Sequence, residues 1–348
     1  MYKLSVIVPI YNQEKYLRTS IQSIINQTFG FENIELILLD NCSTDSSKDI
    51  ILEFSENYEN IIPILFKENS GEPGTSRNKG LEISSGQYIM FFDPDDYLME
   101  DICETLYNKI IKENADIVSG NAIAMVAGVP YYDIDFKSDP REVIYSTKNY
   151  SDYKEFRVWG SLYKKDFLTK NNIKFLDMTP GEDTYFQQKC FFKQNKICYL
   201  DKYYGYIYFI RNNNSITNTN NTKKSIYSSY YCRIITRKML INEEIKLEYD
   251  PLLSVLYSPF SSKWNLTKNE EIEYFKKILD YKNQIKLPVK LPISYKIPDI
   301  LIERQLFYLT YIYHNLFVII TRFIKLNYRT KIDKDEEIYK KVIKLKDW

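Results

Sequence analysis

The sequence has 348 residues, with 47 Lys or Arg against 46 Asp or Glu, so its formal net charge is +1. This balance argues against a general nucleic-acid-binding protein, because a phosphate-rich partner favours an excess of basic residues. A hydrophobic content of 44% is that of a globular protein, and the length suffices for one large domain with a smaller appended region.

The five cysteines are scattered, without the close pairs that zinc sites or disulfide frameworks use, which favours reduced thiols. The opening residues, MYKLSVIVPIYN, enter an apolar segment at once and lack the basic start and cleavage site of a signal peptide. Both features predict a cytoplasmic protein.

The first 120 residues alternate between apolar runs and segments with helical spacing. Short, nearly continuous apolar runs predict strands buried on both faces. Strands that alternate with helices over short connections predict a doubly wound α/β fold, with a mostly parallel central sheet flanked by helices. The expected strands are 4–10, 34–40, 61–68, 87–92 and 115–125, and the expected helices are 14–29, 45–58, 74–84 and 98–110.

The second half is less regular. Residues 133–217 predict short aromatic-rich strands, including 196–210, and residues after 225 predict helices. We therefore divide the chain into residues 1–220, with a boundary near 120 between two halves, and a C-terminal helical region, 221–348. The apolar stretch 306–323 leaves two interpretations open, a core helix or a helix lying on a membrane surface. His314, within that stretch, is interpreted as structural.

Three carboxylates crowd the end of the strand at 87–92, in the segment FFDPDDYL. Pro94 cannot donate to a sheet ladder, so the strand is expected to end here with Asp93, Asp95 and Asp96 on a turn. Asp93 and Asp95 can converge on one hard cation, since residues two apart at a strand end can point the same way. An acidic turn that caps the next helix is the alternative.

Five segments occur in an order that resembles the family 2 glycosyltransferases, which have the GT-A fold. They are LSVIVPIYNQEKYL, IELILLDNCSTDSS, KENSGEPGTSRNKGLEISSGQYIMFFDPDD, PGEDTYF and YFIRNNNSIT, and together they cover about residues 4–217. The resemblance implies a GT-A fold, Rossmann-like, and the transfer of one sugar with inversion at the anomeric carbon.

The same resemblance implies a nucleotide-sugar site. Tyr11 would stack on the base beside the turn shaped by Pro9, and Asp40 would accept a hydrogen bond from the uracil N–H. Asn69 and Arg77 would lie along the ribose and diphosphate, a task that suits the forked guanidinium. Two residues of a later polar loop, Arg211 and Ser215, would close over the diphosphate.

The metal and catalytic roles follow from the same motifs. Asp95 would bind Mn²⁺ or Mg²⁺, and Asp93 would contact the ribose or metal-bound water. Asp183 would be the general base for the acceptor hydroxyl, with Glu182 in support. The alternative is that Glu182 and Asp183 are only an acidic pair at the start of a helix, where negative charge is favourable. Trp159 would line the acceptor site, although a core Trp is equally compatible with the pattern.

Two departures from the family pattern stand out: Asn41 replaces an aspartate, and Ser161 replaces a basic residue. The predicted function is a metal-dependent transfer from a UDP-sugar to a glycan, with a lipid-linked acceptor in bacterial capsule or surface polysaccharide synthesis and peripheral membrane contact through the C-terminal region. The alternative is a non-catalytic protein that binds a sugar nucleotide or glycan. A nucleotidyltransferase is disfavoured, because PIYNQEKYL lacks a glycine-rich basic loop.

Overall fold

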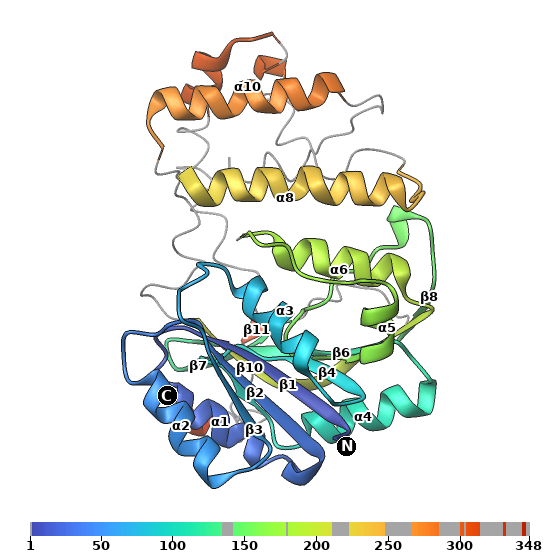
Figure 1. Ribbon diagram of the computed structural model, residues 1–348. Helices are drawn as coiled ribbons and strands as arrows, with labels where there is room; N and C mark the ends of the chain where they lie inside the picture. Colours follow the sequence, from blue (N-terminus) through green and yellow to red (C-terminus); the bar gives the residue numbers. More distant parts are fainter. Residues whose placement is uncertain are drawn as a thin grey trace.

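The computed structural model describes residues 2–133, 142–178, 180–210, 223–247, 266–284, 300–302, 304–313, 330–331 and 343–345. Within these residues the strands form one mixed sheet in the order β11-β7-β6-β9-β4-β1-β2-β3, with β10, β5 and β8 joined to it through β10 (Figure 1). The α/β architecture predicted from the sequence is confirmed.

One half of the sheet is parallel. It contains β1 (Leu4–Ile10), β2 (Ile34–Asp40), β3 (Ile61–Leu65) and β4 (Tyr88–Phe91), with β1 between β4 and β2. Every residue of β1 and β2 is buried, as expected of strands covered on both faces.

Helices cover both faces of this sheet. On one face, α1 (Leu17–Ile25), α2 (Ser47–Asn57) and α4 (Ile102–Glu113) pack against alternate residues of β1 such as Val6 and Val8. On the other, α3 (Pro73–Ile83), α5 (Lys165–Lys170) and α6 (Glu182–Lys193) pack against the intervening residues such as Ile7. The alternation follows from the two-residue period of a strand.

The other half of the sheet is largely antiparallel. β9 (Ser161–Lys164) runs antiparallel between β4 and β6 (Ile117–Val126). β10 (Lys196–Ile210) is one long strand with register shifts between Leu200 and Tyr206, where the sequence predicted short strands. The remaining strands are β5 (Tyr97–Leu98), β7 (Val129–Asp133), β8 (Val143–Tyr145) and β11 (Thr330–Lys331).

The C-terminal part contains α8 (Lys223–Asn242) and α10 (Lys268–Gln284), with α8 lying over α6 (Figure 1). The Tyr230 hydroxyl of α8 donates to the Lys277 carbonyl of α10 at 3.1 Å. A separate apolar cluster joins the two helices, which confirms the predicted helical character of this part. Short 3-10 turns occupy Phe31–Asn33, Tyr150–Asp152 and Ile343–Leu345.

Only residues 306–313 of the predicted apolar stretch 306–323 are described, and His314 lies outside the described residues. Leu306, Tyr308 and Leu309 are exposed, whereas Thr310 is fully buried. Within the described residues, no helix combines the length and apolar character needed to cross a membrane. The choice between a core helix and a surface helix therefore stays open.

Candidate active site

The predicted nucleotide-binding residues gather at the carboxyl edge of the parallel strands. Ile10, at the end of β1, pairs with Asp40 at the end of β2, and β4 leads on the other side of β1 into Asp93. Pro9 is the second-last residue of β1, and Tyr11 follows directly with 45% of its surface exposed. Ligands of doubly wound sheets bind at this edge.

Asp40 is held by its own turn. Its carboxylate, in a side chain that is almost completely buried, accepts the backbone N–H of Ser43 at 3.2 and 3.3 Å from its two oxygens. These bonds fix the turn that follows β2, and contact of Asp40 with a uracil stays a prediction.

Asn41, the departure from the family pattern, fixes the loop that carries Asn69. Its Nδ2 donates to Asn69 Oδ1 at 3.1 Å, and its Oδ1 accepts from the backbone N–H and hydroxyl of Ser70 at 3.0 and 3.1 Å. An aspartate could not donate the first of these bonds. Sequence reasoning did not find this positioning role, because nothing near Asn41 in the chain identifies residues 69–70 as its partners.

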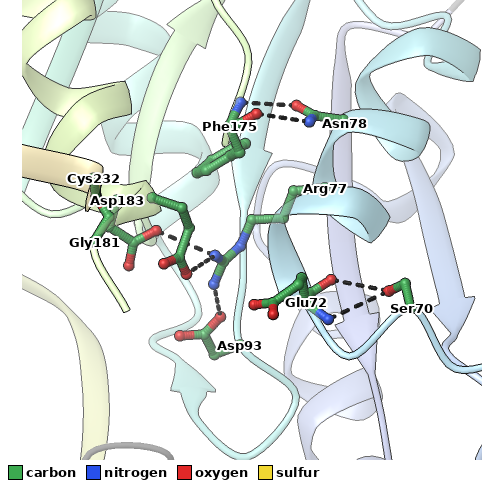
Figure 2. Close-up of polar contacts among 10 residues, drawn as sticks. Ser70, Glu72, Arg77, Asn78, Asp93, Phe175, Gly181, Asp183 and Cys232 are labelled. Atoms are coloured by element: carbon green, nitrogen blue, oxygen red, sulfur yellow. Dashed lines mark hydrogen bonds and ion pairs between the residues drawn. The ribbon is translucent and has the colours of Figure 1, made fainter. Parts of the chain in front are cut away.

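Arg77 lies at the centre of the site and joins residues far apart in the chain (Figure 2). Its Nη2 lies 2.9 Å from Asp93 Oδ1, and its Nη1 lies 3.2 Å from Asp183 Oδ1 and 3.7 Å from Glu182 Oε1. Only 6% of the Arg77 side chain is exposed, and its guanidinium lies 5.3 Å from the centre of the Phe175 ring. The structure therefore brings Asp183, the predicted base, and Asp93, the carboxylate predicted to contact the ribose, to one cation.

The three carboxylates and the guanidinium of Arg77 shift one another's pKa values. Burial, and then the charge of Asp183, raises the pKa of Glu182 to about 8 against the opposing effect of Arg77. Burial also raises the pKa of Asp183, to which the charge of Asp93 adds. Burial by itself would lower the pKa of Arg77, but the three carboxylates together raise it above its ordinary value. The raised pKa of Glu182 favours its protonated form near neutral pH.

Asp183 is more open than its partners, with 41% of its side chain exposed against 6% for Glu182. Its Oδ1 faces Arg77. The acidic pair begins α6, where the helix dipole favours a negative charge. Gly181 precedes it with φ of 122°, and a Cβ there would lie 2.8 Å from Cys232, so only glycine fits.

A clamp between α3 and the segment before α6 positions these groups. Asn78 Nδ2 donates to the Phe175 carbonyl at 3.0 Å, and the Phe175 N–H donates to Asn78 Oδ1 at 2.9 Å (Figure 2). Thr75 adds a hydroxyl donor to Asp177 at 3.1 Å. Asn78 was not among the predicted residues, and its place directly after Arg77 is the single sequence feature that could have suggested it.

The three aspartates of the turn have different environments. Asp96 is buried and accepts hydrogen bonds from the Tyr206 hydroxyl at 2.8 Å and the Phe209 N–H at 3.0 Å. Burial, with the charges of Asp95 and Asp93, raises the pKa of Asp96 well above its usual range. Asp96 thus anchors the turn to β10, whereas Asp93 and Asp95 stay partly exposed.

Trp159 lies next to this turn. Its ring stacks on Tyr206 at 4.2 Å between centroids and lies 5.7 Å from Tyr208, while the Arg157 guanidinium sits 4.8 Å from it. The half-buried ring is thus firmly held beside the site, and its contact with an acceptor stays a prediction. Arg211 and Ser215 lie outside the described residues.

Within the described part of the chain, no group of three or more His, Cys, Asp or Glu side chains is arranged to hold a metal ion. Asp95 and Asp93 offer carboxylate oxygens at a partly exposed edge. That donor set fits Mg²⁺ or Mn²⁺, which can take their remaining ligands from phosphate and water.

Comparison with known proteins agrees with this geometry. The profile of the family "Glycosyl transferase family 2" matches residues 5–167 of the 348, so this part of the chain is similar to that family. Glycosyltransferase GlyA of Streptococcus pneumoniae is 37% identical over 211 residues, which are 58% of this chain and 30% of that protein. The poly(ribitol-phosphate) beta-glucosyltransferase of Bacillus spizizenii is 30% identical over 215 residues, 60% of this chain and 32% of that protein.

The chain thus spans about a third of the length of these two curated relatives. Among solved structures, residues 1–349 of S. aureus TarS in complex with UDP-GlcNAc give a TM-score of 0.68 at 20% identity, covering 94% of this chain and 93% of that one. This likeness confirms a GT-A-like fold with a helical C-terminal part.

Proposed function

We propose that the chain transfers a sugar from a UDP-sugar to a hydroxyl group of a cell-surface glycan, with inversion at the anomeric carbon. The observation that carries the proposal is the Arg77 cluster, which sets the partly exposed Asp183 beside Asp93 at the ligand-binding edge of the sheet. The UDP-GlcNAc bound by the structural neighbour TarS supports a uridine donor.

Asp183 performs the acid–base step. As the acceptor oxygen attacks the anomeric carbon, its proton passes to Asp183 Oδ2, and the bond from that carbon to the diphosphate oxygen breaks. Glu182 retains its own proton and therefore does not compete for Arg77. Arg77 holds the base in place through its ion pair with Asp183.

Asp95 and Asp93 would hold Mn²⁺ or Mg²⁺, which stabilises the negative charge that accumulates on the departing UDP. Tyr11, next to β1, would cover the base, and Asp40 and Asn69 would bound the nucleoside. In this arrangement the nucleotide lies over the ends of β1 and β2, and the acceptor approaches from the side of Trp159.

The acceptor we propose is a lipid-linked surface glycan, as in capsule or teichoic acid assembly, met at the inner face of the cell membrane. The name of the B. spizizenii relative, a poly(ribitol-phosphate) beta-glucosyltransferase, supports a surface-polymer acceptor. The exposed apolar side chains Leu306, Tyr308 and Leu309 support peripheral contact with lipid. Co-sedimentation with anionic vesicles tests this contact, and unchanged partitioning after truncation near residue 288 would contradict it.

A donor screen tests the activity directly. The full chain is incubated with a panel of UDP-sugars, with Mn²⁺ or with EDTA, and release of UDP is measured. The proposal expects metal-dependent release from one or a few UDP-sugars. Tight UDP-sugar binding without release or transfer to any glycan would favour the alternative, a non-catalytic sugar-nucleotide-binding protein.

A further inference from the structure

The hydroxyl group of Tyr206, on β10, joins both ends of the acidic turn at residues 93–96. It donates to Asp96 Oδ2 at 2.8 Å and accepts from the backbone N–H of Asp93 at 3.4 Å. The Asp96 N–H donates in turn to the Asp93 carbonyl at 3.1 Å, which closes the turn. Since a hydroxyl can donate one hydrogen bond and accept others, a single group ties the first and last residues of the turn to β10.

Asp95, the proposed metal ligand, lies between these two ends. Pro94 precedes it, and the proline ring fixes the backbone angle φ at that position. A turn of four residues that is held at both ends, with one angle fixed between them, leaves the Asp95 backbone little freedom. The hydrogen bonds of Tyr206 therefore determine where the Asp95 side chain leaves the backbone.

Asp93 connects the same hydroxyl to the Arg77 cluster. Its backbone N–H donates to Tyr206, and its side-chain Oδ1 lies 2.9 Å from Arg77 Nη2. The carboxylates of Asp93 and Asp95 thus extend from a backbone that Tyr206 holds. Two carboxylates can share one cation only if the structure around them keeps both in place, and such supporting bonds have a strong effect on metal affinity.

The ring of Tyr206 is enclosed, which gives its hydroxyl a fixed position. Tyr206 is 2% exposed, its ring stacks on Trp159 with 4.2 Å between centroids, and it meets Phe92 edge-on at 5.8 Å. Gly160, with φ of 65°, passes so close that a Cβ there would lie 2.6 Å from Tyr206 Cδ2. A hydroxyl held this firmly is a preorganised support for the turn.

We propose that Tyr206 is a positioning residue for the metal site, whose hydroxyl sets the turn so that Asp93 and Asp95 bind one divalent cation. In this role it acts through the backbone of residues 93–96 and need not touch the cation. The inference rests on the proposed function, because it requires UDP and Mn²⁺ or Mg²⁺ to bind at this turn. It adds to the site a side chain that lies 110 positions after Asp96 in the chain.

Tyr206→Phe tests this role, because it keeps the ring and removes only the hydroxyl. UDP affinity of the full chain is measured by titration calorimetry in Mn²⁺ and in EDTA. We expect the affinity in Mn²⁺ to fall about tenfold or more and the affinity in EDTA to stay that of the wild type. Tyr230→Phe is the matched control, since it also removes a buried hydroxyl, which donates to the Lys277 carbonyl at 3.1 Å, and it should keep the full effect of Mn²⁺.

Asp95→Ala provides a second measurement, which separates a role at the metal from a general loss of stability. With this ligand removed, adding Tyr206→Phe should weaken UDP binding in Mn²⁺ no further, whereas independent effects would add. Full Mn²⁺-dependent affinity in a folded Tyr206→Phe protein, equal losses in Mn²⁺ and EDTA, or additive effects in the double variant would overturn the role of Tyr206.

Equal UDP affinity of the wild type in the two buffers would also overturn this role, because no cation would then act at the turn. Failure of the wild type to bind UDP in either buffer would instead contradict the proposed function, so the two failures are distinguishable.

Discussion

At the scale of single residues, the site is organised by the guanidinium of Arg77 and by the protonation of the carboxyl groups around it. Arg77 contacts Asp93, Glu182 and Asp183 and is shielded from solvent. The sequence motifs predicted all four residues as site candidates, but placed Arg77 along the ribose and diphosphate. Its ion pairs could not be predicted, because they depend on how α3 and α6 meet in three dimensions.

The raised pKa of Glu182 predicts a pH-dependent effect of Glu182→Gln on stability. The folded protein keeps this proton up to about pH 8, whereas the unfolded chain loses it near pH 4.5. Wild-type stability from this group therefore falls as pH rises between these values. Glutamine does not ionise, so the free energy of unfolding of the variant should rise relative to that of the wild type across this pH range. The difference should reach on the order of a few kcal/mol at the upper end of the range.

Urea unfolding of both proteins at several pH values measures this difference. Glu59→Gln, at an exposed loop position, serves as the control and should follow the wild type throughout. A Glu182→Gln stability curve parallel to that of the wild type would show that Glu182 is ionised in the folded protein at neutral pH.

Asp95→Ala tests the proposed metal ligand. We expect the variant to bind UDP in Mn²⁺ no better than the wild type does in EDTA, because the carboxylate that would hold the cation is gone. UDP affinity is measured by calorimetry in both buffers, with the exposed Asp49→Ala as control. If Mn²⁺ raised the UDP affinity of Asp95→Ala as much as that of the wild type, other residues would hold the metal.

At the scale of elements, helix α3 holds the site residues in position. One turn of this helix provides Arg77 to the acidic cluster and Asn78 to the Phe175 backbone, so both contacts share one rigid support. Apolar runs predicted the four strands of the parallel half, with the exact bounds of β1 and β2, whereas β3 and β4 are shorter than predicted. The bounds of β9 were not predicted within the region of expected short strands, since four residues directly before α5 show too little alternation to indicate a strand.

Asn78→Ala removes both hydrogen bonds of the clamp and leaves the Phe175 N–H and C=O without their partner. We expect a loss of stability of about 1–3 kcal/mol. We also expect kcat to fall more than the affinity for UDP, because the segment before Glu182 and Asp183 loses its register against Arg77. Thermal unfolding and steady-state kinetics measure the two effects.

A matched control is Asn171→Ala, whose side chain donates to the Phe167 carbonyl of α5. It should lose stability without a specific loss of kcat. If Asn78→Ala reduced stability and left kcat unchanged, the clamp would be structural only.

At the scale of the whole molecule, the parallel half carries the residues predicted to bind the nucleotide, and α6 brings the proposed base, Asp183, beside them. Apolar runs and acidic motifs predicted the fold class and the edge where the candidate residues gather, because both signals are local in sequence. The hydrogen bonds of Asn41 and Asn78 could not be predicted, because each joins distant segments. The proposed division at residue 220 and the roles of Arg211 and Ser215 stay predictions.

The most direct test of the account is the rate of sugar transfer in Asp183→Asn, measured in single turnover with a saturating UDP-sugar and acceptor. Asparagine can still accept a hydrogen bond from Arg77 but is not a base, so UDP affinity should be unchanged and the rate should fall about 10²–10⁴-fold. Near-normal transfer by Asp183→Asn would contradict the assignment of Asp183 as the base and, with it, the mechanism proposed for this site.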